Sequence, residues 1–250
     1  MDMFHAFIWP FHGFVLAHIV TGAVGLFAFW VPLIARKGGD SHRVWGRVFG
    51  WSMLSTGAIA CCIAGLTIFD PVGTHPHLDF EPVLIQGIFG WMMLYLAILT
   101  VNLAWYGLMC VKQRRDHAGN RSRKNLTLQA VLAVAAANCA WRGIRLEQIL
   151  MVGISFVGFA TVATNLWFIY KPRHGPLDWL KEHLKGLVGA GISVYTAFFA
   201  FGAVRLMPEL ALHPGLWSVP LVTGLTIILY QWRKIGRQRP TPAGAARLAS

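Results

Sequence analysis

The segment FHGFVLAHIVTGAVGLFAFWVPLIA, residues 11–35, is a nearly continuous run of apolar residues with His12 near its start and a second histidine, His18, well inside it. Roughly 20 apolar residues are needed for an α-helix to cross the hydrocarbon core of a bilayer, which is about 30 Å thick. The apolar residues here do not alternate with the period of two that is typical of a transmembrane β-strand. The segment therefore predicts a membrane-spanning helix.

Comparable apolar stretches recur along the whole 250-residue chain, which is 56% hydrophobic and only 13% charged. This composition lies outside the range of ordinary soluble domains. Seven spans are predicted, at residues 11–35, 46–69, 83–111, two within 125–170 joined by a tight turn at 141–148, 186–207 and 215–232. The predicted fold is an all-α polytopic transmembrane bundle that occupies residues 1–235 as one domain. A disordered basic tail is predicted over residues 236–250, which are rich in Pro, Ala and Arg.

The net charge of +12 follows the predicted loops. Most of the 22 Lys and Arg residues fall in alternate loops and in the tail, whereas acidic residues are enriched in the other loops. By the positive-inside rule this asymmetry predicts an N-terminus outside, a cytoplasmic C-terminus and a multi-pass protein of a bacterial cytoplasmic (inner) membrane. The expected partner is the lipid bilayer, with other membrane-protein subunits as further candidates. The charge is thereby explained without a nucleic-acid partner, and none is expected.

The depth of His18 makes it a candidate functional residue. A rise of 1.5 Å per residue places it roughly 10 Å inside the outer boundary of the first span. An unsatisfied polar side chain at that depth would cost about 2 to 7 kcal/mol, so a bonding partner is expected. Two hypotheses remain open: His18 is a cofactor ligand, or it is a neutral imidazole that bonds to a hydroxyl or carbonyl group on the next helix.

Sulfur-containing residues are predicted at a similar depth on the second and third spans. Cys62 lies roughly 10 Å and Met92 roughly 13 Å inside, with Cys61 and Met93 beside them. Imidazole, thiol and thioether groups suit Cu(I) or an axial position on haem iron, so His18, Met92 and Met93 are candidate cofactor ligands. The candidate cofactors are copper, zinc and haem b. Ordinary packing of Cys and Met in an apolar interior is the alternative.

Histidines also gather on the predicted outer side. His12 precedes the first span's core, and His75 and His77 lie in GTHPHLDFEP, residues 73–82. Together with His18, Cys61 and Cys62 they are the candidate metal ligands, and the outer histidines would form an entry site. The alternative is that these loop histidines are simply solvated.

The predicted cytoplasmic side carries a candidate proton relay. His42 lies in KGGDSHRVWGR, residues 37–47, and Glu182 and His183 lie in GPLDWLKEHLKG, residues 175–186. Histidine titrates near physiological pH, which suits proton transfer. The second segment also has the pattern of a short amphipathic helix lying on the membrane before the sixth span, and a purely anchoring role is the alternative.

Two segments resemble one family of predicted bacterial integral membrane proteins, which is catalogued as a domain of unknown function. They are HIVTGAVGLFAFWVPLIARKGGDSHRVWGRVFG, residues 18–50, and YKPRHGPLDWLKEHLKGLVGAGISVYTAFFAFGAVRL, residues 170–206. The resemblance implies the same multi-pass architecture but no reaction. The positions that it marks are His18, His42, Arg43, Gly46, Glu182 and His183.

These observations favour two classes of function. The first is redox-metal or haem handling, by electron transfer or metal delivery, from the periplasmic half of the bundle. The alternative is a small-molecule transporter or a non-enzymatic assembly partner of a membrane complex. In that case the span amides would line a polar path: Gln86, Asn102, Gln129, Asn138 and Asn165. Whether the protein is an enzyme is left open.

Overall fold

The structure is a computed structural model that describes residues 3–199 and 214–237, and within those ranges it contains helices and no strands. The helices are α1 (Met3–Ile34), α2 (Asp40–Phe69), α3 (Pro71–Thr74), α4 (Pro82–Ile85), the π-helix η1 (Gln86–Met92), α5 (Met93–Lys112), the 3₁₀-helix η2 (His117–Arg121), α6 (Arg123–Arg145), α7 (Ile149–Tyr170), α8 (Asp178–Ala197) and α9 (Pro214–Arg237). The predicted all-α fold is confirmed. The predicted tail falls almost wholly outside the described residues.

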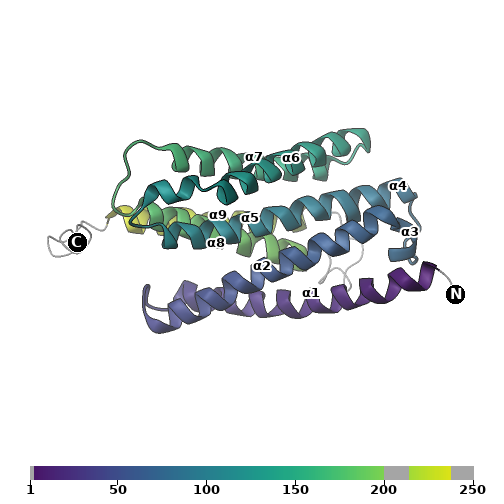
Figure 1. The fold of residues 1–250 in the computed structure, drawn as a ribbon, viewed down its shortest axis with the longest axis horizontal. Coiled ribbons are helices and arrows are strands. Elements are labelled where there is room, and N and C mark those ends of the chain that lie inside the picture. Colours follow the sequence, from purple (N-terminus) through teal and green to yellow (C-terminus); the bar gives the residue numbers. More distant parts are fainter. Residues whose placement is uncertain (1–2, 200–213, 238–250) are drawn as a thin grey trace.

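The long helices run side by side along one axis (Figure 1). Helices α1 and α2 form one layer and α6 and α7 form another, with α5, α8 and α9 between them (Figure 1). Helix α5 packs against α2, α6 and α8, so it forms the centre of the bundle. The α1–α2 and α7–α8 loops lie at one end of the bundle, called here the loop end, and α3 and α4 lie at the other end.

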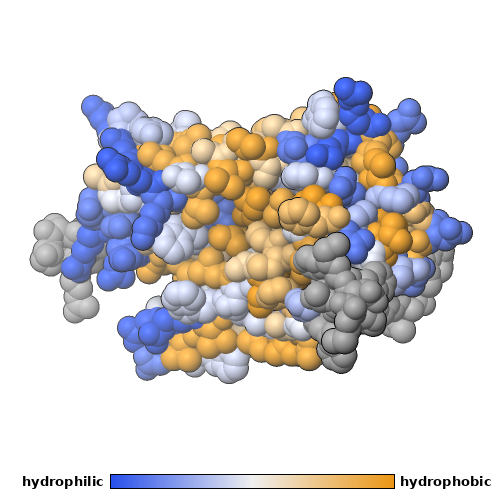
Figure 2. Space-filling model, turned by 45° about the vertical axis from the view of Figure 1, so that its right-hand side comes forward, coloured by the Kyte–Doolittle hydropathy of each residue, from blue (hydrophilic) through white to orange (hydrophobic). Residues whose placement is uncertain are grey.

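Four segments are long and apolar enough to cross a membrane: Pro10–Ile34, Asp40–Phe69, Pro82–Lys112 and Ile149–Tyr170. They correspond to the first, second, third and fifth predicted spans. Figure 2 shows the matching surface, in which an orange hydrophobic belt separates hydrophilic residues gathered at the two ends of the molecule. The protein is therefore a membrane protein whose apolar helices contact the lipid bilayer.

The predicted surface helix over residues 175–186 is not a separate element. It forms the first part of α8, which continues without interruption from Asp178 to Ala197. Gly186 lies inside this helix, and its backbone packs directly on α5. A Cβ atom added to Gly186 would lie 2.7 Å from the Cα atom of Gly107. This close approach keeps Gly186 inside a regular helix and brings the polar start of α8 against the centre of the bundle.

Candidate polar site between α5, α6, α7 and α8

The structure places His18 against a neighbouring helix. The imidazole is partly buried, and its Nδ1 atom lies 3.2 Å from the backbone carbonyl oxygen of Thr56 on α2. A carbonyl oxygen can only accept, so the Nδ1–H group donates this hydrogen bond. The partner required by the depth of His18 is thus a backbone group, and the bond joins α1 to α2.

The four sulfur-containing candidates lie in different surroundings. Cys62 is exposed on α2 and Cys61 is partly buried, whereas Met92 is completely buried. Met93 packs at the edge of the hydrophobic core. In the described ranges, 3–199 and 214–237, no group of three or more His, Cys, Asp or Glu side chains is arranged to hold a metal ion.

The outer histidines lie at the end of the bundle near α3, where ring contacts link them in pairs without forming a group of three that could hold a metal ion in the described residues. The ring of Phe11 lies 5.8 Å from His12 and 5.9 Å from His75, centroid to centroid. His77 lies 6.1 Å from His75 by the same measure. Burial, and then the charge of the neighbouring His77, lower the pKa of His75 to about 4. His75 is therefore neutral at physiological pH and holds its place beside Phe11 as an uncharged ring.

The three candidate relay residues all lie at the loop end, but each forms its hydrogen bond with a different partner and none bonds to another of the three. His42 Nδ1 lies 2.9 Å from the carbonyl oxygen of Pro32, and His183 Nδ1 lies 2.9 Å from that of Gly107. Each imidazole thus donates to a backbone carbonyl on another part of the bundle. Glu182 instead accepts from the hydroxyl of Tyr106, at 2.6 Å. The two histidines therefore hold helices together, while the carboxylate joins a second polar group.

Three of the five predicted span amides meet in the centre of the bundle. The Nδ2 group of Asn165 on α7 donates to Asn102 Oδ1 at 3.4 Å and to Gln129 Oε1 at 3.2 Å. Asn102 on α5 in turn donates to the backbone carbonyl of Leu128 on α6, at 3.0 Å. All three side chains are at most 1% exposed. Two of their atoms, Gln129 Nε2 and Asn165 Oδ1, are buried and have no hydrogen-bond partner among the described residues.

A partly buried ion pair continues this cluster toward the loop end. Tyr106 lies one helical turn after Asn102 on α5, and its hydroxyl bonds to Glu182 on α8. The same carboxylate lies 2.5 Å from the Lys185 ammonium group. Lys185 also donates to Thr164, the residue before Asn165 on α7, at 3.2 Å. We call these residues the polar cluster: Asn102, Tyr106, Gln129, Asn165, Glu182 and Lys185.

A separate groove of about 390 Å³, which no residue of the polar cluster lines, lies between α6 and the η1–α5 segment. Its lining begins at Ala130, next to Gln129, and ends at Asn138 and Trp91. Asn138 accepts from the Nε group of Arg142 at 3.1 Å, and that guanidinium lies 4.0 Å from the ring centroid of Trp91. The groove is therefore lined mainly by apolar side chains, with the Asn138–Arg142–Trp91 contacts at one end.

The sequence did not single out Tyr106 or Lys185 as site residues. Their signal was the spacing: Tyr106 follows Asn102 by four residues and Lys185 follows Glu182 by three, so each pair shares a helix face. Of the remaining amides, Asn138 lies in the groove, whereas Gln86 bonds to the backbone carbonyl of Ile68 at 2.8 Å.

Comparison with protein-family models, with curated proteins and with solved structures finds no match for this chain. The site is therefore interpreted from its own geometry.

Proposed function

We propose that this protein moves a small polar solute across the membrane by way of the polar cluster. The observation that carries the proposal is the pair of unpartnered buried atoms, Gln129 Nε2 and Asn165 Oδ1. One is a hydrogen-bond donor and the other an acceptor. Each costs about 1 to 3 kcal/mol while it stays unsatisfied in the interior. A solute that offers both an acceptor and a donor would satisfy the two atoms at once.

The depth of the cluster supports this function. Asn102 lies ten residues before the end of the apolar segment Pro82–Lys112, which has 31 residues. At 1.5 Å per residue the segment is about 46 Å long and Asn102 is about 15 Å from its end, inside a hydrocarbon core of about 30 Å and about 8 Å from its midplane. Transporters commonly bind their substrates near the midplane. The ion pair between Glu182 and Lys185 would then form the approach from the loop end.

The proposal includes seven spans, an external N-terminus, a cytoplasmic C-terminus and a location in a bacterial cytoplasmic membrane. Helices α6, α8 and α9 supply the three further spans. They have 23, 20 and 24 residues, which corresponds to about 30 to 36 Å, the thickness of a hydrocarbon core. They pack beside α5 in the bundle (Figure 1). Labelling of single cysteines from either side of sealed vesicles tests this topology.

The transport proposal is tested by the swelling of proteoliposomes in urea, glycerol and glycine. We expect the wild-type protein to accelerate swelling in at least one of these solutes. Asn165→Leu should abolish the acceleration because it removes the central amide of the cluster. The matched control is Gln86→Leu, which removes a span amide outside the cluster and should leave the rate unchanged. A wild-type rate equal to that of protein-free vesicles in all three solutes would contradict the proposal.

We retain redox-metal or haem handling as a second proposal, which rests on the residue types His12, His75 and His77 at one end of the bundle and not on a preformed ligand set among the described residues. Imidazole nitrogens are good ligands for copper and zinc. Elemental analysis and an absorption spectrum of the purified protein test this function independently of transport. Stoichiometric metal, or a haem Soret band, would support it. A colourless protein that stays metal-free after copper and zinc are added would refute it.

A further inference from the structure

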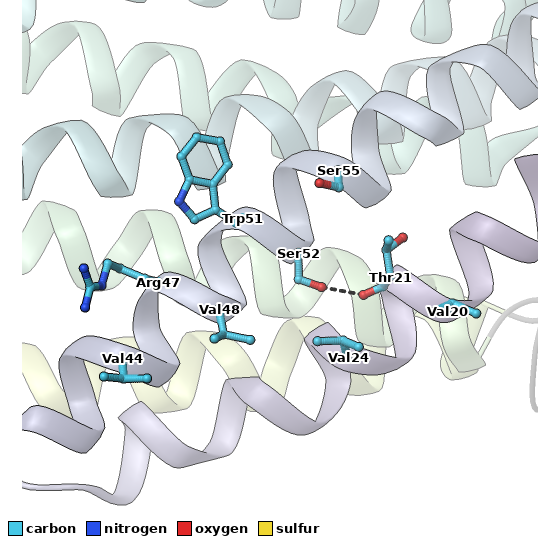
Figure 3. Close-up of a pocket in the computed structure, with 9 residues that line it drawn as sticks. All are labelled: Val20, Thr21, Val24, Val44, Arg47, Val48, Trp51, Ser52 and Ser55. Carbon is cyan, nitrogen blue, oxygen red and sulfur yellow. Dashed lines mark hydrogen bonds between the residues drawn. The ribbon is translucent and has the colours of Figure 1, made fainter.

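A second groove, of about 560 Å³, lies on the outer surface of the bundle where α1 and α2 meet (Figure 3). It has no residue in common with the polar cluster. Its lining is mostly apolar and consists of Val20, Thr21, Val24, Val44, Arg47, Val48, Trp51, Ser52 and Ser55. All four valines are exposed, as is Trp51. Because α1 and α2 are both apolar enough to span a membrane, this groove opens toward lipid.

The groove has the depth of one membrane leaflet. Helix α2 has 30 residues and is therefore about 45 Å long, so about 8 Å at each end lies outside a hydrocarbon core of about 30 Å. Arg47 is about 10 Å from the start of α2, at the edge of the core, and Ser55 is about 22 Å from it, at the midplane. The groove thus runs from the membrane surface to the middle of the bilayer.

Arg47 supplies a positive charge at the surface end of the groove. Figure 3 shows its side chain extending toward the end of α2 where Val44 lies, which is the loop end. In contrast to Arg43, which pairs with Asp40 at 2.6 Å, Arg47 forms no hydrogen bond or ion pair with any residue in the described ranges. A guanidinium at this level of the membrane meets the phosphate groups of the lipids, with which it can form two parallel hydrogen bonds.

The hydroxyl groups of the groove do not offer a competing polar site at its centre. Ser52 donates to the backbone carbonyl of Thr21, as the dashed line in Figure 3 shows. Thr21 itself donates to the carbonyl of Ala17 within its own helix, at 2.8 Å. The middle of the groove therefore presents mainly methyl groups, which suit a hydrocarbon chain.

We propose that this groove is a binding site for one anionic phospholipid of the leaflet at the loop end. The lipid phosphate binds Arg47, and one acyl chain lies along Val20, Val24 and Val48 as far as Ser55. Basic pockets between membrane helices are known to select anionic headgroups in this way. The single cation at the surface end distinguishes this occupant from a second copy of the chain, which would cover the valines without needing a charge.

Native mass spectrometry with phosphatidylglycerol and phosphatidylcholine tests the site. We expect the wild-type protein to retain phosphatidylglycerol at least fivefold more strongly than phosphatidylcholine, and Arg47→Gln to remove this preference. The matched control is Arg237→Gln, which removes a charge from the end of α9 and should keep the preference. Equal retention of both lipids by the wild-type protein would overturn the proposal, as would an unchanged preference in Arg47→Gln.

A second measurement follows the fluorescence of Trp51, which lines the groove, in the wild-type protein. Phosphatidylglycerol brominated on its acyl chains should quench a fraction of the tryptophan fluorescence at lower lipid fractions than brominated phosphatidylcholine does. That difference should disappear in Trp51→Phe. If the quenching is the same for both lipids, or if Val24→Cys forms dimers in high yield in vesicles, the groove is not a headgroup-selective lipid site and the proposal fails.

Discussion

Replacing Gly186 with alanine places a methyl group in the contact between α5 and α8. The added Cβ atom would lie 2.7 Å from the Cα and 2.8 Å from the N of Gly107, and 2.9 Å from the carbonyl oxygen of Leu103. All three neighbours are backbone atoms, so no side chain can rotate away. Carbon atoms in contact normally stay 3.5 to 4.0 Å apart, so the helices would have to separate by about 1 Å.

The expected cost is the difference between two opposing effects. Overpacking of a tight contact costs about 1 to 3 kcal/mol, while alanine has a helix propensity about 1 kcal/mol better than glycine. We expect Gly186→Ala to lower the free energy of unfolding by up to about 2 kcal/mol. The hydrogen bond between Tyr106 and Glu182, 2.6 Å long, spans the same two helices and should lengthen with them, so that transport activity falls as well.

Reversible unfolding in mixed micelles, with increasing fractions of a denaturing detergent, measures this change. The matched control is Gly65→Ala on α2, because a Cβ atom at Gly65 has no heavy atom within 4 Å. There the gain in helix propensity stands alone, and we expect stability equal to or slightly above that of the wild-type protein. The two substitutions should therefore have opposite signs. If Gly186→Ala is as stable as Gly65→Ala, α5 and α8 do not pack as described.

Two further predictions concern histidines. His18→Ala should lower the free energy of unfolding in micelles by about 0.5 to 1.5 kcal/mol, because it removes the hydrogen bond to Thr56. The metal content of the protein should not change. Loss of bound metal in an equally stable variant would contradict the helix-joining role of His18. Burial, and then the charge of His77, lower the pKa of His75 to about 4 in the folded protein, whereas its pKa in an unfolded chain is near 6.5. Between these two pH values the unfolded chain binds more protons than the folded protein does. The free energy of unfolding should therefore fall as the pH decreases from about 6.5 to 4. His75→Phe should flatten this decline in a pH series of thermal unfolding, whereas an equal decline in the variant would show that another group is responsible.

The architecture was predictable because hydropathy and length act locally. The run around His18 needs no knowledge of its neighbours to be identified as a span, and the same holds for α2, α5 and α7. The partner of His18 was predictable only as a class, a hydroxyl or carbonyl group, because its identity depends on the rotation of α1 against α2. The separation of Cys62 from Met92 depends on rotation in the same way, since one lies on an exposed face and the other in the core.

The polar cluster was the hardest feature to predict, and the reason is physical. Charged residues near the ends of α6 and α8, together with Gln129 and Glu182, lower the average hydropathy of these helices, which therefore fall below the level that identifies a span from composition alone. Yet Gln129 is 1% exposed, and Glu182 is bonded to Tyr106 inside the bundle. The free-energy cost of burying these polar side chains is offset by hydrogen bonds to partners on other helices, and an average over one helix does not include those partners. The sequence analysis named Asn102, Gln129, Asn165 and Glu182 one by one, but their meeting in one cluster depends on how the helices pack and is not encoded in any single helix.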